Sequence, residues 1–393
     1  MIASQQAALL LVSLAILILP GVSRLLRVPS MVSEIIFGII LGRSVLKLEF
    51  GGDWLPFLAH LGFLLLMFRA GMEIDFTMLQ QQRRGPLLFQ AAFFAATLGC
   101  AALVAALLSH GFFVALMLST TSLGLVMPTL KETGMSRTET GQTILIAATL
   151  ADFMTLFGIT FYVLYIQQGI NWHFFLPVPL FLGFGLLLRL GRVWVWWHPT
   201  EAERILSIQE DAQEIGVRLS MALLFLFVAL SELVRMEPVL GAFLGGSLLA
   251  YVFREKPLLE TKLSAMGFGF LIPVFFIHVG MQFDLTHLLK PRMILFSIEL
   301  LGAALMVKMA PALLLFLRGW KPREVLATGF LLSSRLSLIV AAAAVGVQNG
   351  LITPDVKDAV VLMAIVTCFL GPTLFKRITP PPGAPGHPLP RRK

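Results

Sequence analysis

The chain has 393 residues, of which 57% are hydrophobic and only 13% charged, and it carries a formal net charge of +8. This composition is too apolar for a soluble globular domain and is typical of a polytopic membrane protein. Apolar segments of about 20 residues recur along the chain, which favours spanning helices over a membrane barrel. The expected partner is therefore the lipid bilayer, and nucleic acid is not indicated, because the placement of Lys and Arg matters more here than their sum.

Thirteen membrane spans are predicted, with short connections and no soluble domain within 1–379. The final residues, 380–393, are rich in Pro and basic residues and are expected to form a disordered tail. The predicted spans are 5–23, 29–46, 54–72, 86–108, 111–131, 140–167, 173–191, 214–235, 238–253, 263–282, 293–317, 325–347 and 356–375.

The distribution of basic residues predicts the orientation. With thirteen spans and the N-terminus outside, most of the 30 Lys and Arg residues fall on the cytoplasmic side. With one span more or fewer, the Lys and Arg residues of the later loops would fall on the opposite side and the cytoplasmic excess would be lost. The C-terminus is then expected in the cytoplasm.

An internal repeat relates the two halves of the chain. The segment 71–75, Gly-Met-Glu-Ile-Asp, matches 280–284, Gly-Met-Gln-Phe-Asp. The predicted orientation puts Asp75 inside and Asp284 outside, so the halves are expected to be inverted. Such a plan, with repeat one over 5–167, a linker helix over 173–191 and repeat two over 214–375, is typical of secondary transporters.

Asp152 is the strongest candidate for an ion site. It lies in the middle of the sixth predicted span, and no other charged residue occurs between Glu139 and Arg189. A carboxylate at membrane depth costs a few kcal/mol, so it usually marks an ion, proton or substrate site. The alternative interpretation is a helix-to-helix hydrogen bond.

Two predicted spans contain hydroxyl runs that suggest interrupted helices. The fifth includes Thr120 and Thr121, and the twelfth includes Ser333 and Ser334. Unwound backbone supplies carbonyl oxygens to a cation, and half-helix ends supply partial charges. The alternative is that these hydroxyls bond the preceding turn and permit close packing.

Two basic residues accompany these candidates within the spans. Lys308 either stabilises an ionised partner or an interrupted helix end, or is a structural tether. Arg335 is expected to satisfy carbonyls of the broken helix and to stay protonated, so it is not expected to carry protons. Glu34 in the second span either lines the inner mouth or is a charge near a helix N-terminus.

Several motifs together resemble the bacterial monovalent cation:proton antiporters, especially their Kef-type and Nap-type branch. Any one motif is modest, but five occur in the family's order over nearly the whole chain. They are PSMVSEIIFGIILG at 29–42, FRAGMEID at 68–75, the broken fifth span at 118–134, LGAFLG at 240–245 and PVFFIHVG at 273–280.

The resemblance implies a homodimer in the bacterial inner membrane, with a dimerisation layer and a mobile core that carries the ion across as an elevator. Asp152 matches the family's ion-binding carboxylate. Its neighbour Ala151 departs from the acidic or amide residue usual there, so Lys308 lacks its usual partner. Leu336 also departs, because many relatives have Arg-Gly-Glu where Arg335 and Leu336 stand.

The expected function is exchange of Na⁺ or K⁺ for H⁺, with Asp152 binding either ion and with oxygens of the two hydroxyl runs completing the site. One acid suggests an electroneutral cycle. No cofactor is expected, and no nucleotide-binding regulatory domain is expected because the chain stops at Lys393. Two alternatives are an organic anion symporter of similar fold and a non-transporting membrane sensor. An enzyme is least favoured, because the sequence has no nucleophile–base pair, metal cluster or phosphate loop.

Overall fold

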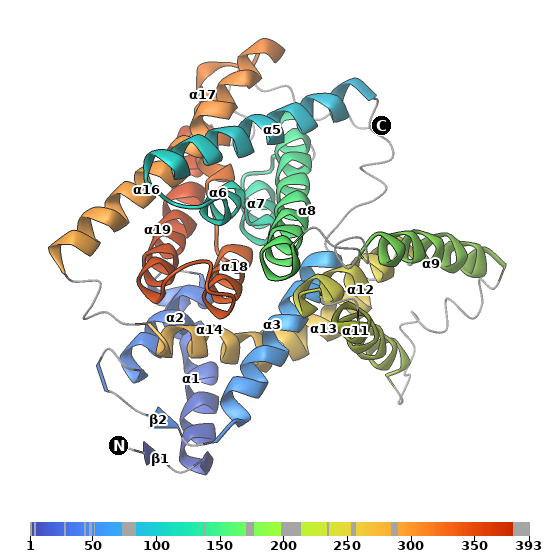
Figure 1. Cartoon of the computed structure of the whole chain (residues 1–393), viewed down its shortest axis with the longest axis vertical. Coiled ribbons are helices and arrows are strands. Elements are labelled where there is room, and N and C mark those ends of the chain that lie inside the picture. The colour runs from blue at the N-terminus through green and yellow to red at the C-terminus, as the bar shows by residue number, and fades with distance from the viewer. Residues whose placement is uncertain are drawn as a thin grey trace. The chain divides into compact units, whose positions relative to one another are not determined.

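The computed structural model describes most of the chain, and the described part is helical apart from its turns and one pair of two-residue strands, β1 (Ile2–Ala3) and β2 (Glu49–Phe50) (Figure 1). The predicted tail at 380–393, and Glu73, Asp75 and Asp284 of the repeat, lie outside the described residues. These described residues are 2–3, 5–26, 29–42, 45–46, 49–50, 52–72, 84–136, 138–169, 177–197, 214–233, 236–252, 257–283 and 290–379.

The chain divides into two compact units, and each draws helices from both halves of the sequence. Unit 1 comprises Met1–Thr77 and Leu164–Thr286, and unit 2 comprises Met78–Val163 and His287–Lys393. Unit 1 contains α1 (Gln5–Leu26), α2 (Ser30–Leu41), α3 (Trp54–Met72), α9 (Pro177–Trp197), α11 (Ile215–Leu233), α12 (Pro238–Val252), α13 (Pro257–Met266), the π-helix η2 (Gly267–Leu271) and α14 (Ile272–Met281).

Unit 2 holds the helices in which the candidate ion site was predicted. It contains most of α8 (Glu139–Gln168), whose last residues belong to unit 1. Its other helices are α5 (Arg84–Leu107), α6 (Phe112–Ser119), α7 (Leu123–Glu132), α16 (Pro291–Ala312), the 3₁₀-helix η3 (Leu313–Arg318), α17 (Pro322–Leu332), α18 (Ser337–Gln348) and α19 (Pro354–Ile378).

Each of the thirteen predicted spans coincides with a helix or with consecutive helices of the described chain. By length and composition, eight helical segments can cross a membrane, and α17 with α18, bent by 43°, adds a ninth. The helices α2 and α12 and the stretch Leu9–Leu25 are shorter apolar segments. The tenth span begins at Pro257, earlier than predicted, and contains the π-helix. The prediction of a polytopic all-helical membrane protein is confirmed.

Proline begins several of these helices. Pro291, Pro322 and Pro354 open α16, α17 and α19. A proline in the first turn loses nothing, because its missing N–H would have no partner within the helix and its fixed φ suits the helix. Thr353 also caps α19 by accepting a hydrogen bond from the Val356 N–H.

Glycines in unit 1 bring four helices into backbone contact in two equivalent pairs. In the first pair, a Cβ on Gly38 of α2 would overlap the Ile277 carbonyl of α14, and one on Gly280 would overlap the Ile35 carbonyl. Only glycine permits such an approach between helix backbones.

The second pair repeats this arrangement with the roles of the two halves exchanged. A Cβ on Gly246 of α12 would overlap the Phe68 carbonyl of α3, and one on Gly71 would overlap the Phe243 carbonyl. The second helix of each half therefore packs on the third helix of the other half, which is the contact pattern of a two-fold relation.

The direction of α14 supports inverted halves. Gly38 of α2 faces Ile277, and Gly42 at the end of α2 faces Met281, so α2 and α14 run the same way. Consecutive spans such as α2 and α3 run in opposite directions across a bilayer. Because α14 is the counterpart of α3 but runs with α2, the two halves have opposite orientations, as the charge distribution predicted.

Replacing Gly280 by Ala is expected to destabilise unit 1, because the added methyl group would overlap the Ile35 carbonyl, and overpacking typically costs about 1–3 kcal/mol. We expect a melting temperature several degrees lower in detergent, measured by intrinsic fluorescence. Gly21→Ala in α1 is the matched control, since nothing lies within 4 Å of its Cβ position. Equal melting temperatures for the two variants would contradict the packing argument.

Candidate functional site

Two helices of unit 2 are interrupted at the predicted hydroxyl runs. The helix α6 ends at Ser119 and α7 begins at Leu123, while α17 ends at Leu332 and α18 begins at Ser337 (Figure 1). Ser and Thr side chains compete with the backbone for hydrogen bonds and so favour helix ends. Hydroxyls compete in this way at both breaks.

Three hydroxyls near the breaks donate to carbonyls of the preceding turn. Thr120 Oγ1 donates to the Met117 carbonyl at 2.7 Å, and Ser333 Oγ donates to the Phe330 carbonyl at 2.6 Å. Ser119 does the same toward the Leu116 carbonyl. In this conformation these side chains satisfy the ends of α6 and α17.

The two breaks are hydrogen-bonded to each other. The Ser122 N–H donates to the Ser334 carbonyl at 2.9 Å, and Thr121 Oγ1 donates to the Leu332 carbonyl at 3.2 Å. The structure therefore brings the fifth and twelfth spans together at their interruptions. The side chain of Ser334 instead lies against α19, where its Oγ occupies the place of a Cβ on Gly371.

Arg335 joins three segments at the crossing. Its Nε donates to the Thr120 carbonyl at 3.1 Å and its Nη2 to the Leu118 carbonyl at 2.5 Å. Both terminal nitrogens also donate to the Ala304 carbonyl of α16, at 3.1 and 3.0 Å. The side chain is 0% exposed. Arg335 thus supplies donors to the free carbonyls at the end of α6, where the helix dipole is negative.

Lys308 binds the same helix end from α16. Its Nζ donates to the Ser119 carbonyl at 2.7 Å, and the residue is 2% exposed. The charges of Arg335 and Asp152 both act on this ammonium. Lys308 therefore contacts an interrupted helix end within the protein, one of the roles that the sequence left open.

Asp152 lies at the other end of the break. Its Oδ2 accepts a hydrogen bond from the Leu123 N–H, the first residue of α7, at 3.3 Å. A helix N-terminus carries partial positive charge, so a carboxylate is favoured there. The side chain is half-buried. Positive groups thus face the end of α6, and a negative group faces the start of α7.

Thr155 is a neighbour of Asp152 that the sequence did not single out. Its Oγ1 donates to the Ala151 carbonyl at 2.6 Å and to the Asp152 carbonyl at 3.2 Å. The sequence signal that could have found Thr155 is a threonine within one turn of this acid on the same helix. This hydroxyl lies at the backbone of the acid and fixes the local helix.

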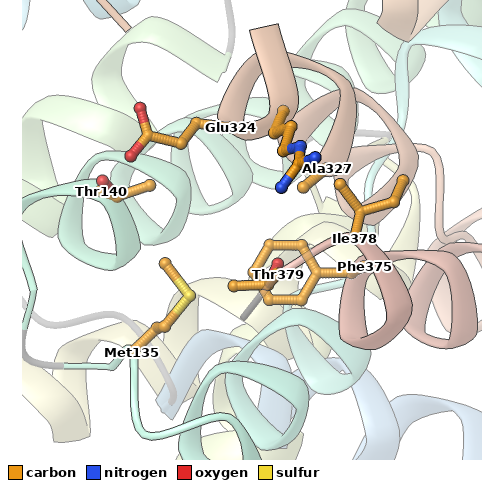
Figure 2. A pocket seen from close by; sticks show the side chains of 8 residues that line it. Met135, Thr140, Glu324, Ala327, Phe375, Ile378 and Thr379 are labelled. Atoms are coloured by element: carbon orange, nitrogen blue, oxygen red, sulfur yellow. The ribbon is translucent and has the colours of Figure 1, made fainter. Parts of the chain in front are cut away.

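A pocket in unit 2 is lined by other residues. Figure 2 shows Glu324 and Thr140 across the opening from Phe375 and Ile378. None of the eight lining residues is a predicted ion-site residue. They are Met135, Thr140, Arg323, Glu324, Ala327, Phe375, Ile378 and Thr379.

Together, the fold and the site define a polytopic membrane protein in which three charged side chains, Asp152, Lys308 and Arg335, gather at two crossing, interrupted helices. A family model described as "Sodium/hydrogen exchanger, transmembrane" matches residues 10–379. The chain belongs to this sodium/hydrogen exchanger family.

Individual relatives agree with this assignment. A Bacillus subtilis protein named as the Na(+)/H(+) antiporter YjbQ is 36% identical over 90% of this chain, which spans 59% of that protein's length. A Methanocaldococcus jannaschii protein named as Na(+)/H(+) antiporter 3 is 26% identical over 92% of this chain and 94% of its own. The solved sodium proton antiporter MjNhaP1 of Methanocaldococcus jannaschii has a similar fold, with a TM-score of 0.62, 14% identity and 95% of both chains covered.

Replacing Arg335 by Leu is expected to destabilise unit 2 severely, because it removes the donors to three buried carbonyls. Each buried polar group left without a partner costs about 1–3 kcal/mol. Arg335→Lys should recover only part of the loss, since one ammonium cannot reproduce the planar fork. Thermal unfolding in detergent measures both. Arg323→Leu is the control, because Arg323 is exposed in the same unit, and an equal loss of stability there would refute the assigned role.

Proposed function

We propose that the protein exchanges a monovalent cation, Na⁺ or K⁺, for H⁺ across the bacterial membrane, with Asp152 as the group that both ions use in turn. The observation that carries this proposal is the position of Asp152, a half-buried carboxylate of the continuous helix α8 that accepts a hydrogen bond from the first residue of α7, one half of a broken helix. Membership of the exchanger family supports it, as do the names of the relatives, which are sodium/proton antiporters.

Competition at one carboxylate is sufficient for exchange. A carboxylate that accepts either a proton or a metal cation releases one when it takes the other. The occupied site is neutral and can cross an apolar barrier, whereas the empty, ionised site is held back by the cost of burying a charge. Uncoupled leak of either ion is therefore suppressed.

Oxygens at the breaks would complete the cation site. A hard cation prefers several oxygen ligands, and the hydroxyls and carbonyls of Thr120, Thr121, Ser333 and Ser334 belong to the same crossing. In the described conformation Thr120, Thr121 and Ser333 donate to carbonyls. Their oxygen lone pairs remain the atoms that a cation would use.

The charge balance favours an electroneutral cycle. Lys308 and Arg335 both donate to backbone carbonyls of α6, and Ala151 contributes no second acid beside Asp152. The positive charges of Lys308 and Arg335 thus offset the dipole of the α6 half-helix. Asp152 is then the one carboxylate at the site that is available to exchange ions. We infer one cation carried per proton.

The division into two units favours an elevator. Asp152, the two breaks, Lys308 and Arg335 all belong to unit 2, so the whole site can move as one body with that unit. Unit 1, with its glycine contacts between helix backbones, suits a stationary scaffold and a dimer interface. In the proposed orientation in the inner membrane, the N-terminus lies on the outer side and the C-terminus on the cytoplasmic side.

Replacing Asp152 by Asn is expected to abolish exchange, because an amide cannot alternate between a proton and a cation. The measurement is cation-dependent collapse of a pH gradient in proteoliposomes, with Na⁺, K⁺ and Li⁺ each tested. The variant should keep the melting temperature and oligomeric state of the parent.

Glu299→Gln is the matched control for this variant. It removes a carboxylate of the same unit that is exposed on α16 and should leave exchange unchanged. Parent-like transport by the Asp152→Asn variant would refute the assignment. Flux of an organic anion without cation-coupled proton movement would instead favour a symporter.

Replacing Lys308 by Ala is expected to change stability or the pH profile of exchange more than ion selectivity, because Lys308 contacts the α6 end and not the cation ligands. Leaving the Ser119 carbonyl without its donor should cost about 1–3 kcal/mol. Melting temperature, pH profile and the ratio of Na⁺ to K⁺ transport distinguish these effects. A changed ratio with the other two constant would place Lys308 in the ion shell.

A further inference from the structure

Glu34 is a buried acid that the exchange mechanism does not use. It lies in the second turn of α2 in unit 1 and is 4% exposed. Among the described residues, no hydrogen bond or ion pair involves its carboxylate. The helices packed on α2 are α1 and α14. Their described ionisable groups are Arg24, which is exposed, and His278, whose Nε2 lies 2.9 Å from the Gln282 amide nitrogen.

The repeat shows that the fold does not need a carboxyl group at this position. Glu34 directly precedes Ile35 in α2, and Ala242 directly precedes Phe243 in α12. Ile35 and Phe243 make equivalent carbonyl contacts with the glycines of α14 and α3. Ala242 is 0% exposed, so a methyl group fills the equivalent place in repeat two. The larger, ionisable side chain of Glu34 is therefore an addition to the shared packing.

The surroundings of Glu34 favour a proton over a metal cation. A cation site needs several oxygen ligands, but among the described residues no hydroxyl is hydrogen-bonded to the Glu34 carboxylate. Ser33 Oγ lies 2.5 Å from Ser23 Oγ, so one of these two hydroxyls donates to the other. The hydroxyl that accepts then donates to a carbonyl of its own helix, Ser33 to Ser30 or Ser23 to Leu19. A lone buried carboxyl is accommodated when neutral, and its ionised form requires water or a counter-ion.

We propose that Glu34 is a second proton-binding site, separate from Asp152 and located in unit 1, whose occupancy changes over the pH range in which the protein works. With the proposed orientation, the start of α2 lies at the cytoplasmic side, so this site responds to cytoplasmic pH. Its effect on transport rests on the proposed exchange function. Proton binding by Glu34 does not depend on the exchange function.

The first experiment measures proton binding without transport. Infrared difference spectra of the purified Asp152→Asn variant are recorded across a pH titration, and the carboxyl C=O band is followed. A band from a weakly hydrated carboxyl should disappear as the pH rises. This component should be lost in Asp152→Asn/Glu34→Gln and kept in Asp152→Asn/Glu299→Gln. A titration identical in both double variants would overturn the proposal. Loss of the band on adding Na⁺ or K⁺ at constant pH would make Glu34 a cation site and would also overturn it.

The second experiment measures the consequence for exchange. Glu34→Gln and Glu34→Ala are compared with the parent in proteoliposomes over a range of internal pH. Both should fold, because repeat two holds Ala242 at the equivalent place. We expect exchange to persist in both variants, with the pH profile shifted by about one unit or one of its limbs lost. A parent-like profile, or no exchange at any pH in a folded variant, would overturn the regulatory role. If Asp152→Asn still exchanges ions, the proposed function fails while the infrared result stands.

Discussion

The central constraint on this structure is that four half-helix ends meet within the apolar part of the protein. Water cannot satisfy the free N–H and carbonyl groups there, so the protein itself must supply partners. The partners are of opposite sign at the two sides of one break. Arg335 and Lys308 donate to carbonyls at the end of α6, and Asp152 accepts from the first N–H of α7. The remaining groups are shared between the breaks, through the Ser122 N–H and the Ser334 carbonyl.

This arrangement links stability to chemistry. The two cations are occupied by backbone dipoles, so they are fixed parts of the crossing and set the electrostatic potential at Asp152. The acid faces the positive end of a helix, where a negative charge is favoured. The groups that hold the two breaks together therefore lie beside the carboxylate of the proposed ion site.

Much of the fold followed from periodicity and charge. The spans were found because apolar runs of membrane length are unambiguous, and the inverted plan followed from basic residues together with the match between 71–75 and 280–284. The breaks were found because hydroxyl runs within apolar segments are rare. The sequence also indicated that Arg335 would bind carbonyls of a broken helix, although most of those carbonyls belong to α6 and α16 and not to its own helix pair. Which carbonyls a long side chain reaches depends on three-dimensional packing, and no local pattern encodes it. For the same reason, the sequence did not predict that the Ser334 hydroxyl would lie against Gly371 of α19.

The glycine contacts of unit 1 have a genetic consequence. At the four glycines that join α2 with α14 and α3 with α12, the opposing atom is a carbonyl of the peptide backbone, as at Gly38 with Ile277 and at Gly246 with Phe68. Truncating a neighbouring side chain creates no room at a contact made by main-chain atoms. Second-site suppressors of a substitution at these glycines should therefore not arise at the residue in contact. They should arise only where a change lets an entire helix shift, and each glycine should evolve independently of the side chain opposite.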